Sequence, residues 1–306
     1  MRLFTKRKPK YPLHQSNFMK MERLILVVLI FITLAFSGCI SKPELRYVKN
    51  NWGSVNEAYT EIITKAGVYN PLPIPLPIKD IKTEIFKNEI KMGQGSAIKA
   101  DIGANTVSDV IISTKINNEK IVDWWISHVK NNEITNVDVK GDLIIDILGI
   151  TQFGYPLDFK SQIKTQILDA IGFKEPKGFS GFFIEGMSSE WGEANKDYTE
   201  IKINVKFKIS SPIRIVKLRY YIELNDIKLA DGVDSVNKNI ESSRDVEFSI
   251  YINNNKIPKW WVSHIKNGEK SVGKVVIKPT IEIAGKELEI ALIEQPISFE
   301  TNMLGD

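Results

Sequence analysis

Two histidines occur in the same short pattern, Ser127-His128 and Ser263-His264, and histidine is the side chain most often used as a base or metal ligand near neutral pH. A zinc or catalytic site needs convergent partners, and no H-x-H or H-E-x-x-H motif surrounds either histidine. Neighbouring residues of a helix point about 100° apart, so each serine cannot face its own histidine. We therefore interpret both histidines as structural, each hydrogen-bonded to a neighbouring strand or loop. Metal binding or catalysis by a histidine is the alternative.

Each histidine follows a tryptophan pair, Trp124-Trp125 or Trp260-Trp261. An exposed pair would make a platform for lipid headgroups, sugars or peptide, whereas a buried indole would anchor a lone helix on a sheet. Because adjacent helix positions cannot both point inward, we expect Trp124 and Trp260 at the rim of the fold. The candidate binding surface is Trp124, Trp260, His128 and His264.

The two blocks are copies of one another. Residues 116–131 and 252–267 both read I-N-N-x-K-I-x-x-W-W-x-S-H-x-K-N, with eleven of sixteen positions identical at an offset of 136. The likeness extends in the same order to residues 52–62 and 191–201, each with Trp-Gly followed by Tyr-Thr-Glu-Ile. The chain is a tandem duplication. We therefore interpret the rare residues of the motif first as structural parts of each domain and only then as a functional site.

Alternating apolar and polar residues predict short strands in each copy. The clearest run is residues 201–209, which would have an apolar face and a polar face. Antiparallel strands with one wet face pack as a two-sheet sandwich. Further predicted strands are 218–224, 246–252, 275–283 and 288–292, with Ala284-Gly285 as a hairpin turn.

The tryptophan block interrupts this strand rhythm and predicts one short helix in each copy. In the second copy, Asn254 or Asn255 is a suitable cap and Pro258 suits the first turn. Gly268 suits a left-handed helix stop. We expect a tryptophan to hold each helix on its sandwich.

The segments between the expected strands define the domain boundaries. Residues 161–171 fit a helix, and the Gly/Pro/Lys-rich stretch after them fits a linker. Residues 70–77 have proline at every second position, which predicts a polyproline-like edge segment. The resulting division is a basic N-terminus and hydrophobic segment at 1–39, domains at 45–166 and 182–306, and a linker at 167–181.

The charge of the chain lies at one end. The formal net charge is +4, but residues 1–38 carry seven Lys/Arg against one Glu, leaving 34 basic and 36 acidic residues in the rest. A nearly neutral folded part lacks the excess positive charge that binds a polyanion, so we expect no nucleic-acid partner.

The only cysteine, Cys39, follows the uncharged stretch 24–38. Basic residues, a short apolar stretch and small residues form the layout of an export signal. The stretch is shorter than the about 20 residues that span a bilayer, so an export signal fits it better than a permanent span. Residues 36–39, Phe-Ser-Gly-Cys, resemble the lipobox of secreted lipoproteins, although leucine is usual where Phe36 stands. The resemblance implies a lipid anchor on Cys39; the alternative is an uncleaved N-terminal helix, and both place the bulk of the chain outside the cell membrane. Translation from Met19 or Met21 would give a more ordinary signal.

Several motifs in both copies resemble the late embryogenesis abundant type-2 domain, also called the water stress and hypersensitive response domain. The shared order is an N-P or S-P element, a strand leading to N-x-I-K-x-x-x-G, and a capped helix with a tryptophan pair. The first copy departs from it, with Val122-Asp123 where the second has Pro258-Lys259. The matching residues are Asn70-Pro71, Ser211-Pro212, Asn88 to Gly95, Asn225 to Gly232, Ile257-Pro258 and Trp260-Trp261. The resemblance implies mostly β structure, two tandem fibronectin-like antiparallel β-sandwiches each with one short helix, and a role in desiccation or stress. It brings no catalytic residues.

Other chemistry lacks a motif. Asp231, Asp234 and Glu241 are acidic neighbours without a calcium loop, and no P-loop or G-x-S-x-G sequence occurs. We expect no catalytic residue, metal or cofactor.

Three functions follow from these observations. The first is a non-enzymatic, membrane-anchored pair of late embryogenesis abundant type-2 domains on the outer face, with a protective or protein-binding role under water stress. The second is a lipoprotein that binds a solute or polymer in the groove between its domains. The third is an enzyme that uses His128 or His264.

Overall fold

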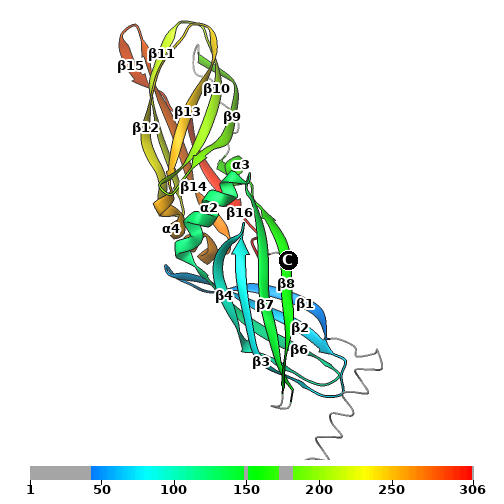
Figure 1. The fold of residues 1–306 in the computed structure, drawn as a ribbon. Helices are drawn as coiled ribbons and strands as arrows, with labels where there is room; N and C mark the ends of the chain where they lie inside the picture. Colours follow the sequence, from blue (N-terminus) through cyan, green and yellow to red (C-terminus); the bar gives the residue numbers. More distant parts are fainter. Residues whose placement is uncertain (1–42, 148–150, 172–181, 305–306) are drawn as a thin grey trace, which may run out of the picture.

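The computed structural model describes residues 43–147, 151–171 and 182–304. They form two elongated β-sandwiches that meet at their helices (Figure 1). We call the part from β1 to α3 the first repeat and the part from β9 to β16 the second repeat. The stretch 24–38 and Cys39 lie outside the described residues. None of the helices in the described ranges has the length and apolar character that a bilayer crossing requires.

The first repeat is one continuous antiparallel sheet that closes around a core. Its strand order is β1-β2-β6-β4-β3-β7-β8, and β4 joins the two layers because it pairs with both β3 and β6. The short β5 pairs with β3. The elements are β1 (Glu44–Val55), β2 (Tyr59–Asn70), β3 (Leu76–Lys87), β4 (Ile90–Lys99), β5 (Asp101–Ile102), β6 (Thr106–Asn117), η1 (Asn118–Lys120), α2 (Ile121–Lys130), β7 (Ile134–Ile147), β8 (Thr151–Lys164) and α3 (Ile167–Ile171).

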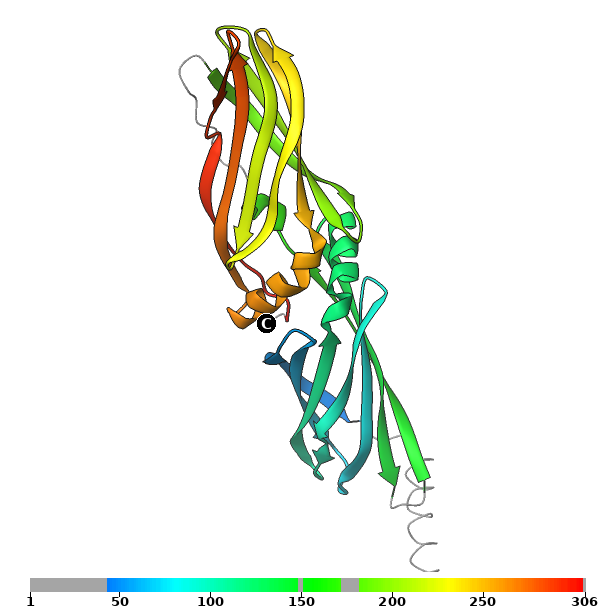
Figure 2. The same ribbon diagram turned by 90° about the vertical axis from the view of Figure 1, so that its left-hand side faces the viewer.

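The second repeat keeps the strand order of the first but has two separate sheets, β13-β10-β9 and β12-β11-β14 with β15 and β16 beside β14 (Figure 2). The elements are β9 (Phe182–Ala194), β10 (Tyr198–Ile209), β11 (Ile213–Leu224), β12 (Ile227–Ile240), β13 (Ser243–Asn253), η2 (Asn254–Lys256), α4 (Ile257–Lys266), β14 (Lys270–Ile283), β15 (Lys286–Glu289) and β16 (Ile293–Glu300).

The predicted class, mostly β with tandem sandwiches and a short helix in each repeat, is confirmed. The residues 201–209 lie in β10, where every second side chain is buried. Ala284 and Gly285 both have positive φ and turn β14 into β15 as expected. The second arm of this hairpin is shorter than predicted, because β15 ends at Glu289.

Two predictions for the connecting segments need correction. The expected helix at 161–171 is limited to α3, because β8 pairs with β7 as far as Lys164. The proline segment at 70–77 is irregular only from Pro71 to Pro75. Pro77 already lies in β3 opposite Asp101, so proline does not exclude it from the edge of a sheet.

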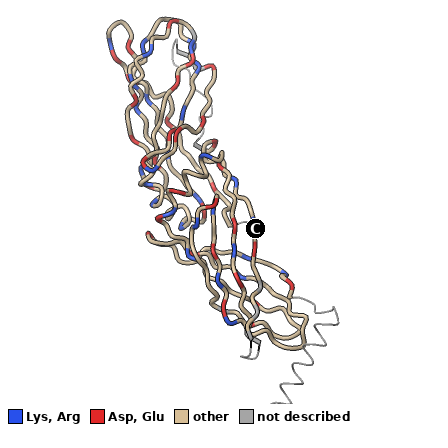
Figure 3. The backbone as a smooth tube through the Cα atoms, in the orientation of Figure 1, with Lys and Arg blue, Asp and Glu red and all other residues tan. Residues whose placement is uncertain are grey.

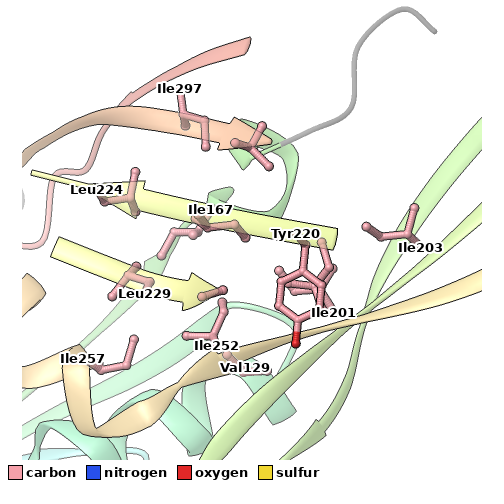
Figure 4. Packing of buried hydrophobic residues seen from close by; sticks show 14 of the residues in the cluster. Val129, Ile167, Ile201, Ile203, Tyr220, Leu224, Leu229, Ile252, Ile257 and Ile297 are labelled. Atoms are coloured by element: carbon pink, nitrogen blue, oxygen red, sulfur yellow. The ribbon is translucent and has the colours of Figure 1, made fainter. Parts of the chain in front are cut away.

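One hydrophobic core extends across both repeats. Figure 4 shows Val129 and Ile167 of the first repeat among side chains of the second, such as Leu224 and Ile252. A smaller cluster of Ile81, Ile102 and Val110 fills the far end of the first sandwich. The continuity of the main core means that the junction of the repeats is packed like a protein interior.

Candidate functional site

Each tryptophan pair lies on a ten-residue helix at the junction of the repeats. Asn117 and Asn253 begin these segments, since each side chain accepts a hydrogen bond from the N–H two residues later. Pro258 lies in the first turn of α4, and Gly268 takes φ +69° after its last turn, both as predicted. The cap Asn253 lies one residue before the predicted Asn254 and two before Asn255, because a turn of 3₁₀ helix precedes each α-helix.

The two tryptophans of a pair point to different repeats. Trp124 Nε1 donates to Thr135 of its own repeat at 2.9 Å, whereas Trp125 Nε1 donates to Thr199 of the other repeat at 2.9 Å. In α4, Trp260 donates to Ser271 of its own repeat. Trp261 donates to Thr60 across the junction at 2.9 Å.

The prediction that Trp124 and Trp260 lie at a rim is wrong. Both are at most 1% exposed, and so are His128 and His264. In a single isolated sandwich, one face of the helix would stay exposed to water. The other repeat covers that face, so both members of each pair are buried and the four residues form no exposed binding surface.

The contacts across the junction are reciprocal. Trp124 packs edge-on against Trp261 with ring centroids 5.1 Å apart, and Trp125 packs against Trp260 at 5.8 Å. Such pairs add about 0.5–1.5 kcal/mol each beyond the area they bury. Because each contact occurs with the repeats exchanged, the junction has the form of a two-fold dimer interface within one chain.

Each histidine is the centre of a buried hydrogen-bonded series. His128 Nδ1 lies 2.8 Å from Thr135 Oγ1, and its Nε2 lies 2.8 Å from Thr165 Oγ1. Thr165 donates to the Glu133 carboxylate, so it accepts from Nε2–H. Thr135 accepts from the indole of Trp124 and donates to Nδ1. The neutral Nε2–H tautomer is therefore the form that satisfies every partner.

The second repeat has the same series. His264 lies 2.8 Å from Ser271 Oγ and 2.8 Å from Thr301 Oγ1, and Thr301 donates to Glu269. Burial lowers the pKa of both histidines to about 4, with Glu133 opposing and Lys87 adding to the effect at His128.

The acidic ends of the two series also fasten the repeats together. Glu133 accepts from the backbone N–H groups of Ile167 and Leu168 and, at 3.1 Å, from Trp191 of the second repeat. Glu269 accepts from the N–H of Met303 and, at 2.9 Å, from Trp52 of the first repeat. Sequence reasoning missed both glutamates, although each lies three residues after the end of its helix.

Lys87 breaks the symmetry of the junction. The corresponding residue of the second repeat is Leu224. The Lys87 ammonium lies 4.7 Å from the ring centre of Trp124 and 5.0 Å from that of Trp261. The described residues place no carboxylate within salt-bridge distance of it, and burial lowers its pKa to about 8 against the pull of Glu269.

The serines next to the histidines do not form a catalytic pair with them. Ser127 Oγ donates to the carbonyl of Trp124 and accepts from Asn88, while His128 points to Thr135 and Thr165. Ser263 has the equivalent contacts. The arrangement therefore offers neither an activated nucleophile nor an accessible base.

The junction does leave an open groove beside α3. Its volume is about 690 Å³, and residues of both repeats line it, among them Gln166, Asp169 and Phe299. A smaller hollow of about 290 Å³ also lies beside α3, shares Gln166 and Asp169 with the groove and reaches Trp191.

Part of the chain is similar to a known protein family. Residues 65–160 match the family model described as late embryogenesis abundant protein. This part of the chain is similar to the late embryogenesis abundant (LEA) family. An uncharacterized protein of Methanocaldococcus jannaschii is 28% identical over 146 residues, which are 46% of this chain and 80% of the relative.

Two solved structures are also similar. A protein from Archaeoglobus fulgidus is 33% identical over 40% of this chain and 100% of its own, with a TM-score of 0.38. A solution structure from Arabidopsis thaliana is 22% identical over 42% of this chain and 84% of its own, with a TM-score of 0.34. Each of these matches covers less than half of this chain.

The buried histidines should titrate well below their ordinary range. Residues 43–306 contain only His128 and His264, so an NMR titration of the imidazole protons should give two midpoints near pH 4. Because the unfolded chain binds these protons near pH 6.5, each histidine makes folding less favourable by up to about 3 kcal/mol as the pH falls from 6.5 to 4. The same residues in urea should titrate near 6.5; midpoints near 6.5 in the folded protein would show that the imidazoles are solvated.

Replacing Lys87 with leucine, the residue of the second repeat, should stabilise the protein at neutral pH by removing a buried charge. The unfolded chain binds the Lys87 proton up to about pH 10.5 but the folded chain only to about pH 8. Wild-type stability should therefore rise between these values by up to about 3 kcal/mol relative to Lys87→Leu, as measured by urea unfolding. A difference between the two proteins that is independent of pH would contradict this account, and Leu224→Lys, the matched exchange, should destabilise.

Proposed function

We propose that this protein is a membrane-anchored, non-enzymatic pair of LEA type-2 domains that faces outward and acts in water stress or by binding other proteins. The observation that carries the proposal is the complete burial of the duplicated histidines and tryptophans, with the polar atoms of the histidine series paired to one another. The residues most like a site therefore hold the fold together. The domain family supports the stress-related role.

Neither histidine is suited to catalysis, because of its burial and its low proton affinity. A general base must reach its substrate and hold a pKa near the working pH. Both histidines are sealed inside the junction with a pKa near 4. The enzymatic alternative through His128 or His264 would require the two repeats to separate.

The anchored state is proposed from the sequence. The apolar stretch at 24–38 and the lipobox-like Cys39 support either a lipid anchor or an uncleaved helix. The motifs shared by the two copies support a second LEA domain in the second repeat.

Nucleic acid is a poor candidate partner. Figure 3 shows Lys/Arg and Asp/Glu interspersed along both repeats, with no face of one sign in this view. Polyanion binding depends on such a face.

The proposed stress role predicts that the protein protects other proteins during drying. Residues 43–306 at an equimolar ratio should preserve the activity of a drying-sensitive reporter enzyme better than an unrelated globular protein of equal mass. Recovery of enzyme activity after drying and rehydration measures the effect. Recovery no better than with the unrelated protein would count against the stress role.

A second candidate function is the binding of a polar solute or polymer, favoured by the groove of about 690 Å³ between the repeats. Gln166 is exposed in this groove, so Gln166→Trp should fill it without disturbing the core. Native mass spectrometry of protein purified without denaturation should show a bound species that the variant lacks. Identical spectra for the two proteins would reject this candidate.

A further inference from the structure

The end of the first repeat that lies away from the junction has unusual loops. Five residues, Pro71 to Pro75, connect β2 to β3, and Gly103 to Asn105 connect β5 to β6. We call these two connections the end loops. From Pro71 to Ile78 no residue has a polar side chain, and Ile74 is 45% exposed. Val107, at the start of β6, is 46% exposed.

The second repeat is an internal control for this feature. Its connection between β10 and β11 is Ser210-Ser211-Pro212, and that between β12 and β13 is Glu241-Ser242. These polar connections lie at the opposite end of the molecule in both ribbon views (Figures 1 and 2). Ile283 and Leu288 are exposed there too, but they flank the charged Lys286 and Glu287 on a strand hairpin. Apolar loops are therefore not a requirement of the fold.

Several polar groups of the end loops are already paired within the protein, which lowers the free-energy cost of removing water from them. Asn70 is fully buried and joins the two loops, since its amide donates to the carbonyls of Ile74 at 2.8 Å and Gly103 at 2.9 Å. Its Oδ1 accepts from the N–H of Leu72, whose own carbonyl accepts from Asn105. Proline has no N–H to leave unpaired in an apolar medium, and three of the five residues are proline.

The position of β1 indicates what covers this end. Glu44, the first residue of β1, pairs with Tyr69, and Tyr69 pairs with Val107. The chain therefore enters the sandwich beside the end loops. Five residues lie between Gly38, the last of the apolar stretch, and Glu44, so these two residues are at most about 20 Å apart along a fully extended chain.

We propose that the end loops of the first repeat lie in the headgroup region of the membrane that holds the N-terminal segment. The two sandwiches then stand away from the bilayer, with the loops of the second repeat outermost. This inference rests on the proposed membrane anchoring. The anchor keeps the loops at a high local concentration near the surface, so a small apolar area is enough to hold them there.

A polarity-sensitive fluorophore tests the proposal. The full chain carrying Ile74→Cys is labelled and inserted into phosphatidylcholine vesicles with a minor fraction of phosphatidylglycerol. Ser211→Cys in the β10–β11 loop is the matched control, and labelled wild-type chain gives the signal of Cys39 for subtraction. We expect fluorescence at position 74 to rise several-fold on insertion and to be quenched by lipids with brominated headgroup-proximal chains, while position 211 stays unchanged.

The possible results of this experiment distinguish the position of the end loops from the membrane anchoring itself. If the chain floats with the vesicles but position 74 is as wet as position 211, the inference is overturned and the anchoring stands. If the chain does not float with the vesicles, both fail. If position 74 is already shielded in lipid-free detergent solution and the chain sediments as a dimer, a second copy covers the loops and the inference is again overturned.

Discussion

The structure depends on one constraint, which is that every indole N–H at the junction must find an acceptor once the two repeats exclude water. Trp125 and Trp261 meet it by donating to Thr199 and Thr60 of the opposite repeat. An unpaired buried donor would cost about 1–3 kcal/mol, so neither repeat can keep both of its tryptophans buried and satisfied alone. The helices are therefore shared between the two sandwiches.

The pairing continues beyond the first acceptor. The Thr60 hydroxyl donates a hydrogen bond to Asn118 Oδ1, and the Asn118 amide donates to the carbonyl of Asn56 in the turn between β1 and β2. Thr199 and Asn254 repeat these contacts in the second repeat. A change in the angle between the repeats would break these series on both sides at once, which favours a rigid junction over a hinge.

The sequence predicted the parts of this arrangement that lie within one repeat. Alternation located the strands such as β10, and Pro258 with Gly268 bounded α4, because these signals depend on local backbone geometry. The exposure of Trp124 could not be predicted in this way, since the surface that covers it comes from the other repeat. The threonine acceptors were visible as the repeated Tyr-Thr-Glu-Ile, but repetition alone does not show that the hydroxyl faces a distant indole.

Lys87 illustrates a signal that was present in the sequence and went unused. It is the fourth member of an alternating series in β3, after Ile81, Thr83 and Ile85, and all four are buried. A lysine at an inward position where the other repeat has leucine marks a place where the two halves have diverged. A buried ammonium without an ion pair is unfavourable. The contacts that offset this cost for Lys87 are those with the indole rings of Trp124 and Trp261, one from each repeat. The duplication thus preserved the reciprocal hydrogen bonds, while Lys87 is one residue that makes the two halves of the junction chemically distinct.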